Sequence, residues 1–353
     1  MGVTRVLLIN QETIPHYRIP VYNDLSAYLA KDNYALTVVS AGTQPGAPHR
    51  IRFDHRVIRL SLPGLARLLL QMNPDVVIYW VRLRHLYLFP ILLLIKALGK
   101  KAIYWGHGSD LYGNTALRLK HYANSIEYRI SDALILYGEH LRKNVHPRYH
   151  GKIFIANNTL SFTAHHGAFE DKNTCLAKYG ISTSKNIICT GRMQTRKRLE
   201  DLLAAFELLD RSDTGLIFVG PDTDGILRNV HGDKIYKLGP IYGDEALDLL
   251  AAADVFCLPG AVGLSIVDAF YCGLPLVTEE GDESPEVMYL KNGLNGFVVP
   301  RGDVAALSAK LSLLLEDDGL RKDFSLAARH EIMTTGHIDK MCRGFRDALR
   351  FAC

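Results

Sequence analysis

The chain has 353 residues, of which 48% are hydrophobic and 22% are charged. This length exceeds what one hydrophobic core normally supports, so we expect two domains, and the composition excludes a largely disordered protein. The net charge of +4 is unevenly spread: residues 1–165 hold 20 Lys and Arg against 9 Asp and Glu, and the remainder is net acidic. A basic first half is typical of a surface that meets anionic lipid headgroups or a phosphorylated acceptor, although it can also be a bias without function.

In the first half, short apolar runs alternate with segments of helical length. The runs are continuous rather than alternating in polarity, as expected for parallel strands covered on both faces. We predict strands at 6–10, 35–40, 76–80, 102–105, 133–137 and 153–156, and helices at 21–30, 86–98 and 116–130. This rhythm predicts a doubly wound α/β sheet.

Two features bear on the compartment. The apolar stretch 86–98 contains Pro90 and Lys96 and is shorter than the ~20 residues that span a bilayer, so we expect a buried helix. No signal peptide is visible before residue 10. The six cysteines lie in the second half without C-x-x-C spacing, which indicates free thiols in a reducing cytoplasm rather than disulfides or a zinc site.

The rhythm restarts after 157–173, a polar segment that we interpret as a linker. We predict strands at 187–190, 216–219, 255–258, 276–278 and 296–299, and helices at 199–209, 244–253, 263–271, 304–316, 320–331 and 339–351. Two consecutive Rossmann-like units imply a cleft between them, where ligands usually bind. The expected domains are 1–165, 166–335 and a C-terminal helix in 336–353.

A basic turn follows the strand at 187–190. Its sequence runs from Gly191 to Leu199 and leads into a helix, which places Arg192 and Lys197 at the carboxyl edge of the sheet. Arg offers a forked donor and Lys a point charge, so the pair suits a diphosphate leaving group. The alternative is a solvated basic turn without a ligand.

A second candidate runs from Leu258 to Pro275. A strand ends in Pro-Gly, small residues follow, and a helix begins near Val262. Free N–H groups at a helix N-terminus bind anions, and glycines let phosphate oxygens approach the backbone. Asp268, just over one turn inside the helix, is placed to accept hydrogen bonds from ribose hydroxyls. The alternative is a packed turn with glycines needed for geometry alone.

A third cluster, Trp105-Gly-His107-Gly-Ser-Asp110, ends a first-half strand and exposes a histidine between glycines. Most histidines are structural, which is the alternative here. The loop after the first strand has no G-x-G-x-x-G fingerprint, and the chain has no Walker, H-E-x-x-H or G-x-S-x-G sequence. The dinucleotide-binding and P-loop classes therefore lack their characteristic residues.

Taken together, these segments resemble the retaining glycosyltransferases of the GT-B fold, in particular family 4 (glycosyl transferases group 1). The resemblance covers most of the chain and is strongest from Gly191 to Pro300. Its elements stand in the family's order: Arg192 with Lys197, Phe218-Val-Gly-Pro221, Leu238-Gly-Pro-Ile241, Ala252-Ala-Asp254, Asp268-Ala-Phe-Tyr-Cys-Gly-Leu-Pro275 and Asn292-Gly-Leu-Asn-Gly-Phe297.

The resemblance implies a GT-B architecture of two Rossmann-like domains facing each other across a cleft, with the C-terminal helix crossing back to the first domain. It also implies roles for individual residues. His107, Arg192 and Lys197 would be catalytic, His107 lying beside the donor sugar. The acceptor would contact Tyr17, Arg18 and Asp110. The nucleotide-sugar would be bound by Arg192, Lys197, Pro240, Ile241, Tyr242, Val262, Gly263, Leu264, Ser265 and Asp268, with the Gly239–Tyr242 segment around the base.

One position departs from the family pattern. The family carries two glutamates separated by seven residues, and here the second position is Asp268 while the first is Gly260. The missing glutamate normally contacts the donor sugar, so sugar recognition must differ or activity is lost. Glu286 is a candidate substitute carboxylate.

The expected function is transfer of a hexose from a UDP- or GDP-linked sugar to a glycan or lipid-linked saccharide, in bacterial-type surface polysaccharide biosynthesis. The alternatives are a nucleotide-sugar epimerase and a non-catalytic GT-B subunit that supports a partner transferase. We expect no metal, no other cofactor and no nucleic-acid partner. The expected location is the cytoplasm, with peripheral contact at the anionic inner face of a membrane as an option.

Overall fold

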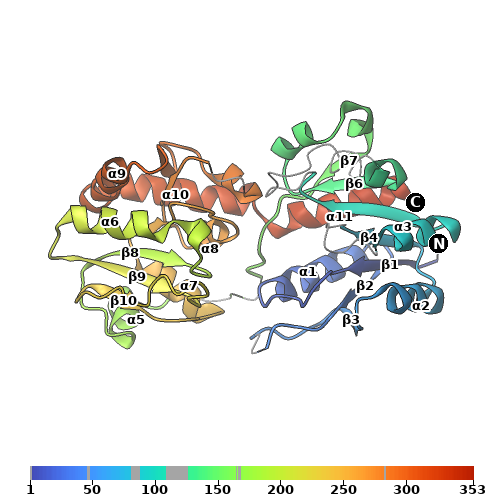
Figure 1. Cartoon of the computed structure of the whole chain (residues 1–353), viewed down its shortest axis with the longest axis horizontal. Helices are drawn as coiled ribbons and strands as arrows, with labels where there is room; N and C mark the ends of the chain where they lie inside the picture. The colour runs from blue at the N-terminus through green and yellow to red at the C-terminus, as the bar shows by residue number, and fades with distance from the viewer. Residues whose placement is uncertain are drawn as a thin grey trace. The chain divides into compact units, whose positions relative to one another are not determined.

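The computed structural model describes residues 2–45, 48–80, 88–108, 126–163, 165, 168–281 and 284–353. The chain divides into two compact units, which we call unit 1 and unit 2. Unit 1 comprises Met1–Ala164 and His337–Cys353, and unit 2 comprises His165–Gly336 (Figure 1). Each unit is built around its own parallel sheet with helices on its faces.

The sheet of unit 1 has seven strands in the order β3-β2-β1-β4-β5-β6-β7. The strands are β1 (Thr4–Ile9), β2 (Tyr34–Ser40), β3 (Asp54–Val57), β4 (Val76–Tyr79), β5 (Lys101–Gly106), β6 (Ala133–Leu136) and β7 (Ile153–Ile155). Successive strands are added on one side of β1 as far as β3 and on its other side from β4 onward. The loops beside such a switch point commonly bind ligands.

The helices of unit 1 cover both faces of this sheet. They include α1 (Arg18–Ala30), α2 (Leu62–Met72), α3 (Leu88–Ala97) and α11 (Ile338–Ala352), with short 3-10 helices at Glu139–Asn144 and Pro147–Lys152. Residues of α1 and α11 share one core cluster with the sheet, and those of α2 and α3 share the other. Helix α11 packs closely on β7, because a Cβ on Gly344 would lie only 2.1 Å from the carbonyl oxygen of Ile155.

Unit 2 has a six-stranded parallel sheet in the order β10-β9-β8-β11-β12-β13. The strands are β8 (Lys185–Thr190), β9 (Thr214–Val219), β10 (Ile235–Lys237), β11 (Val255–Cys257), β12 (Leu276–Glu279) and β13 (Gly296–Val299). The helices are α5 (Lys172–Lys178), α6 (Leu199–Leu209), α7 (Asp244–Ala252), α8 (Ser265–Tyr271), α9 (Val304–Glu316) and α10 (Asp318–Thr334). Helix α6 contacts α9, α5 contacts α7, and α8 contacts α10.

The structure confirms two Rossmann-like units, and the final helix belongs to unit 1. Among the strands and α-helices of the described residues, β3, β10, α2 and α5 were not predicted. Strand β3 is mostly polar and lies at a sheet edge, and the Pro63-Gly64 pair at the start of α2 resembles a loop. The expected linker 157–173 overlaps the start of α5, and its residues Asn158 and Thr159 are buried. The predicted helix at 116–130 lies largely outside the described residues.

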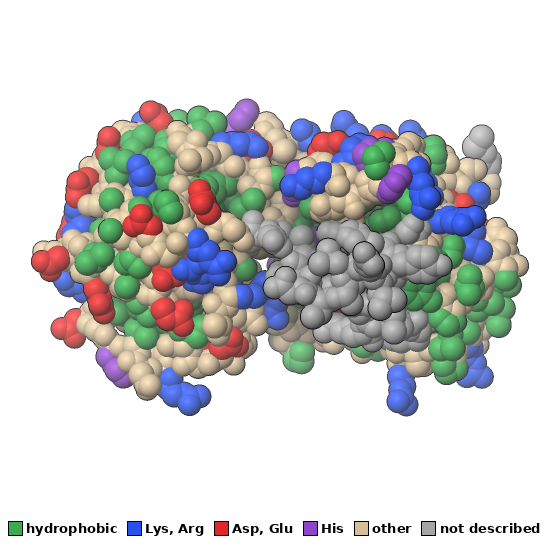
Figure 2. Space-filling model, turned by 45° about the horizontal axis from the view of Figure 1, so that its top comes forward, with side chains coloured by type: hydrophobic (Ala, Val, Ile, Leu, Met, Phe, Trp, Pro, Cys, Tyr) green, Lys and Arg blue, Asp and Glu red, His purple; other side chains and the backbone are tan. Residues whose placement is uncertain are grey.

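The expectation that 86–98 forms a buried helix was wrong for one side of it. Helix α3 buries Ile91, Leu92 and Ile95, but Leu93 keeps 60% of its surface exposed. Figure 2 shows hydrophobic side chains gathered at the right of the view, where Figure 1 places α2 and α3. Periodicity could not reveal this, because α3 has apolar residues all round and hence no polar stripe that marks the solvent side.

Candidate functional site

In unit 2, the loops that follow the parallel strands all leave from the carboxyl edge of the sheet. Three of them begin with a glycine in the left-handed region: Gly191 after β8 (φ +102°), Gly220 after β9 (φ +138°) and Gly239 near the end of β10 (φ +67°). Side-chain-bearing residues rarely adopt such φ angles. Glycine at these positions therefore sets the path of the chain along the edge.

These three loops touch through their backbones. A Cβ on Gly220 would lie 2.0 Å from the carbonyl oxygen of Gly191, which leaves no room for any side chain. On its other side the Gly220 N–H donates to the carbonyl of Gly239 (2.7 Å). The edge is thus lined by main-chain atoms, the form in which a protein approaches phosphate most closely.

A buried lysine and a serine converge beside Gly191. Lys197 is 4% exposed, and its Nζ donates to the carbonyl of Thr190 (3.4 Å). The Ser265 hydroxyl donates to the same carbonyl (3.3 Å). A Cβ on Gly191 would lie 3.2 Å from both Lys197 Nζ and Ser265 Oγ, so only glycine leaves the space between them open.

Arg192 lies in the same loop but is exposed, and its guanidinium has no partner among the described residues. The structure thus brings Lys197 together with Ser265, at the start of α8, and leaves Arg192 available at the rim. A buried ammonium and a forked, solvated guanidinium differ in what they do: the first supplies a fixed charge and the second an adaptable bidentate donor.

Gly260 is packed against the loop at 191–198 that holds Lys197, which we call the lysine loop. Its N–H donates to the carbonyl of Lys197 (2.9 Å), and the Ala261 N–H donates to the carbonyl of Arg196 (3.1 Å). A Cβ on Gly260 would lie 2.2 Å from the carbonyl oxygen of Arg196. The absence of the family's first glutamate is therefore matched by a backbone arrangement that has no space for it.

The lysine loop is also held from its other end. Arg198 has φ +54° and pairs with Asp201 (2.6 Å) and with the buried carboxylate of Glu279 (3.2 Å). Glu279 Oε2 also accepts a hydrogen bond from the Gly302 N–H (3.1 Å). Burial raises the pKa of Glu279. Sequence reasoning missed this residue, and its only signal was an acidic side chain at the end of an apolar strand.

The amides at the start of α8 are only partly available. The Gly263 N–H, expected to bind phosphate, instead donates to Ser284 Oγ (3.1 Å). The N–H groups of Leu264 and Ser265 have no acceptor among the described residues, and first-turn amides have none within their own helix. The expected anion site is therefore reduced at Gly263 and open at the next two residues.

Asp268 lies on α8 and is half-buried. Its carboxylate has no hydrogen-bond or ion-pair partner in the part of the chain that the structure describes, and burial raises its pKa to about 7. A half-buried carboxylate without a protein donor is placed to accept hydrogen bonds from a ligand.

Other predicted residues of unit 2 fall as follows. Pro240 is exposed, and Ile241 and Tyr242 are half-buried, in a loop bounded by Gly239 and Gly243. Val262 is buried. Glu286, the candidate substitute carboxylate, is 4% exposed in the 3-10 helix Pro285–Tyr289. Its burial places it inside the unit and not at the open edge.

In unit 1, His107 follows β5 and is half-buried, with its ring 4.6 Å from that of Tyr137 and 5.5 Å from that of Trp80. Tyr17 precedes α1 and is half-buried. Asp110 lies outside the described residues.

Arg18 is not placed as an acceptor contact requires. It is only 9% exposed, its guanidinium lies 5.6 Å from the Trp105 ring, and Nη2 donates to Asn158 Oδ1 (2.6 Å). These contacts tie α1 to β5 and to the segment after β7. Arg18 therefore supports the carboxyl edge from within, a role that its surface-like sequence context did not suggest.

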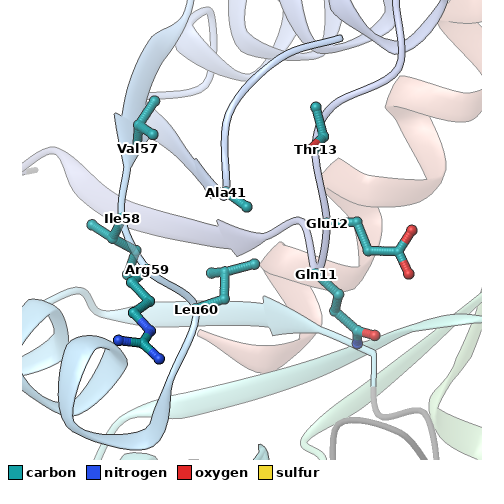
Figure 3. Close-up of a pocket in the computed structure, with 8 residues that line it drawn as sticks. All are labelled: Gln11, Glu12, Thr13, Ala41, Val57, Ile58, Arg59 and Leu60. Atoms are coloured by element: carbon teal, nitrogen blue, oxygen red, sulfur yellow. The ribbon is translucent and has the colours of Figure 1, made fainter.

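Unit 1 also holds a pocket of about 670 Å³ at the carboxyl ends of β1, β2 and β3 (Figure 3). It combines apolar and polar side chains and is lined by Gln11, Glu12, Thr13, Ala41, Val57, Ile58, Arg59 and Leu60. Sequence reasoning missed it, because half of its wall comes from β3 and the segment after it.

Among the described residues, no group of three or more His, Cys, Asp or Glu side chains is arranged to hold a metal ion. In the same part of the chain, no helix combines the length and the apolar character that crossing a membrane requires. All six cysteines are free thiols.

Comparison with known sequences gives a family match for part of the chain. Residues 184–317 match the model of the family described as glycosyl transferases group 1. The chain is 30% identical over 149 residues to the sulfoquinovosyl transferase SQD2 of Arabidopsis thaliana, covering 41% of this chain and 29% of that one. It is 32% identical over 160 residues to the O-antigen chain mannosyltransferase B of Escherichia coli, covering 42% and 41%. The matched segments span less than half the length of these relatives.

Comparison with solved structures extends the likeness to both units. The crystal structure of Anabaena HepE in complex with UDP-glucose superposes with a TM-score of 0.78 over 98% of this chain and 99% of that one, at 14% identity. At this identity the match shows the fold, which is GT-B. The family match covers residues 184–317 of unit 2, so that part of the chain is similar to the group 1 glycosyl transferases.

Proposed function

We propose that the protein is a retaining glycosyltransferase that moves a hexose from a UDP- or GDP-linked sugar to a glycan or lipid-linked saccharide. The observation that carries this proposal is the convergence of Lys197 Nζ and Ser265 Oγ beside Gly191, on a backbone-lined edge. A fixed cation among main-chain groups is suited to a diphosphate, which every donor of this class contains.

Catalysis in this scheme is stabilisation of the charge that develops on the departing diphosphate. Lys197 supplies a buried ammonium, Arg192 an exposed guanidinium, and the free amides of Leu264 and Ser265 two further donors. Donors fixed before the reaction stabilise such charge strongly, each contributing about 10²–10³ in rate. The leaving diphosphate itself would assist attack on the same face of the sugar, so the scheme needs no dedicated base and no metal.

The remaining donor contacts follow from their positions. Asp268 is proposed to accept hydrogen bonds from the ribose, since its carboxylate has no described protein partner. The Pro240–Tyr242 loop is proposed to contact the base, since its backbone adjoins the same edge through Gly239 and Gly220. His107 is proposed to contact the donor sugar from unit 1, on the family resemblance.

The acceptor is proposed to bind at the carboxyl edge of unit 1. Its 670 Å³ pocket falls within the range of small-molecule sites, and its mixed lining suits a saccharide, which has both hydroxyl groups and apolar ring faces. We further propose a role in bacterial-type surface polysaccharide biosynthesis, at the cytoplasmic side of the membrane. The names of the relatives, a sulfoquinovosyl transferase and an O-antigen mannosyltransferase, support saccharide transfer in general.

A panel of UDP- and GDP-sugars tests the proposal, with thermal stabilisation reporting binding and chromatography reporting the product. One donor should stabilise the protein by about 2.7 kcal/mol at a hundredfold excess over its Kd, and transfer should require an added saccharide. Conversion of the donor alone to an isomeric sugar nucleotide would instead establish an epimerase. Donor binding without turnover over a broad acceptor panel would favour the non-catalytic subunit. The packing at Gly260 supports this alternative, because it leaves no space for the glutamate that the resemblance implies.

A further inference from the structure

His107 lies between two glycines at the end of β5, and the structure gives each glycine a specific reason. A Cβ on Gly106 would lie 2.5 Å from the Tyr104 hydroxyl oxygen, so only glycine leaves room for that side chain. Gly108 is buried and has φ +74°, a conformation that side-chain-bearing residues rarely adopt. We call residues 106–108 the histidine segment. Its two glycines fit the segment against the residues packed around it.

Two buried tyrosines bind both polar groups of Gly108. The Gly108 N–H donates to the hydroxyl of Tyr104 on β5 (3.1 Å), and the hydroxyl of Tyr128, which precedes β6, donates to the Gly108 carbonyl. A further hydrogen bond joins the two hydroxyls. Because Tyr128 gives its proton to Gly108, the Tyr104 hydroxyl is the donor in that bond. The three bonds therefore close a ring through Gly108, Tyr104 and Tyr128, and we call the two tyrosines the tyrosine pair.

The tyrosine pair is well placed to hold the segment still. Tyr104 is 3% exposed and Tyr128 is 4% exposed, and their ring centroids are 5.3 Å apart. Burial raises the pKa of both phenols, so both keep their protons near neutral pH. A buried group that loses its hydrogen-bond partner costs free energy, so each bond of the ring opposes a change in the orientation of Gly108.

Fixing Gly108 also fixes His107. The Gly108 N–H belongs to the same planar peptide unit as the His107 carbonyl, so the bond to Tyr104 sets the rotation about the last backbone bond of His107. The imidazole itself lies between two aromatic rings, 4.6 Å from that of Tyr137 and 5.5 Å from that of Trp80, both in edge contact. The backbone and the ring of His107 are thus held by separate sets of residues.

We propose that Tyr104 and Tyr128 are positioning residues for His107, which direct its imidazole from the carboxyl edge of unit 1 toward the donor sugar. The proposal rests on the proposed function for the contact with that sugar. Precise placement matters there, because a displacement of about 1 Å at a reacting group can lower the rate roughly a hundredfold. A pair with a purely structural role would contribute to stability without setting the position of His107.

Kinetics of single variants test the proposal. Tyr128→Phe removes the donor to the Gly108 carbonyl and should lower kcat roughly tenfold, with the donor KM within about twofold because the nucleotide contacts of unit 2 remain. Tyr104→Phe removes the acceptor of the Gly108 N–H and should act in the same direction. An unchanged kcat in both variants would overturn the proposal.

Tyr79→Phe is the matched control. Tyr79 lies beside Tyr104 on the neighbouring strand β4, is 3% exposed, and its hydroxyl is hydrogen-bonded to Ser131 (2.7 Å) instead of to the histidine segment. This variant should lower the Tm about as much as Tyr128→Phe does, because each loses one buried hydrogen bond, and should leave kcat unchanged. An equal loss of kcat in Tyr79→Phe and Tyr128→Phe would assign the effect to stability and overturn the proposal.

A double-variant cycle shows whether the effect passes through His107. In a His107→Ala background, the additional change Tyr128→Phe should alter kcat by less than about twofold, because the side chain that it positions is already absent. The same roughly tenfold loss with and without His107 would show that the tyrosine acts independently of the histidine and would overturn the proposal.

Nuclear magnetic resonance of the full chain without substrate gives a test that does not depend on activity. The imidazole signals of His107, recognised by their loss in His107→Ala, should shift in Tyr128→Phe and Tyr104→Phe and stay in place in Tyr79→Phe. Unmoved signals in the first two variants would overturn the proposal. Absence of transfer by the unchanged protein would contradict the proposed function alone, because the shifts still report whether the tyrosine pair positions His107.

Discussion

The two units have the same kind of sheet, but its carboxyl edge is lined by different groups in each. Unit 2 lines it with glycines and main-chain contacts, where a Cβ on Gly220 or Gly260 would lie 2.0 or 2.2 Å from a neighbouring carbonyl oxygen. In unit 1 the edge is lined by large side chains, among them Trp80, His107 and Tyr137. A backbone surface suits a ligand part that never varies, such as a diphosphate. A surface of side chains can be altered residue by residue, which suits acceptors that differ between related enzymes.

The largest effect is expected at the buried cation of unit 2. Lys197→Gln removes the fixed charge beside Gly191 and should lower kcat/KM about 10²–10³-fold, the range found when one preorganised donor to a developing charge is lost. Lys178 is a surface lysine paired with Glu245, and Lys178→Gln is the matched control. It should change kcat/KM by less than about twofold. A loss at Lys197 below about tenfold would remove the main support for the diphosphate assignment.

The backbone surface itself can be tested at Gly260. Gly260→Glu restores the family's residue but forces a Cβ to within 2.2 Å of Arg196, so the lysine loop must move. We expect a loss of about 2 kcal/mol in the free energy of unfolding and weaker donor binding. Gly151→Glu in unit 1, where nothing lies within 4 Å, is the control. A Gly260→Glu protein of full stability and higher activity would show that the loop adapts and that the missing glutamate alone limits the site.

Asp268 gives unit 2 a pH dependence that unit 1 should not share. Burial raises its pKa to about 7. The ionised carboxylate has both oxygens available to accept hydrogen bonds from the ribose hydroxyls, whereas in the protonated acid one oxygen carries a proton. Donor affinity should therefore fall about tenfold between pH 8 and pH 6, as the carboxylate takes up a proton. Asp268→Asn should remove this dependence, measured by calorimetric titration. An unchanged pH profile in the variant would assign the effect to another group.

The same pKa shift has a consequence for stability with a definite sign. The folded protein holds a proton on Asp268 between its ordinary pKa of 3.8 and about 7, whereas the unfolded chain releases it. The free energy of unfolding therefore decreases as pH rises through this window. Asp268→Asn should raise the Tm at pH 8 by about 3 °C and have less effect at pH 4.

The smallest effect is expected in the pocket of unit 1. Thr13→Val removes one hydroxyl from its lining and should raise the acceptor KM about fivefold, since a single hydrogen bond contributes about 1 kcal/mol. The donor KM measured in the same assay should stay constant. A change in donor KM with constant acceptor KM would reverse the assignment of the two substrates to the two units.

Sequence patterns predicted what repeats along the chain and missed what depends on contacts. The buried strands, such as β1 and β8, are continuous apolar runs, and the positions of Lys197 and Asp268 beside strand ends follow from that rhythm. Strand β3 was missed because Asp54, His55 and Arg56 are polar at a sheet edge. The closed packing of Gly260, the capture of the Gly263 N–H by Ser284 and the burial of Arg18 all depend on loops that meet only in the folded chain.

The core of unit 1 is completed only after helix α11 has been synthesised. Its Met341, Phe345 and Leu349 belong to the core cluster that also contains α1 and β1, yet they follow all of unit 2 in the chain. While the ribosome makes residues 165–336, unit 1 has an open apolar face that α11 has not yet covered, and unit 2 can already fold on its own contacts. Until α11 emerges, nascent unit 1 is the part of the protein that most needs a chaperone.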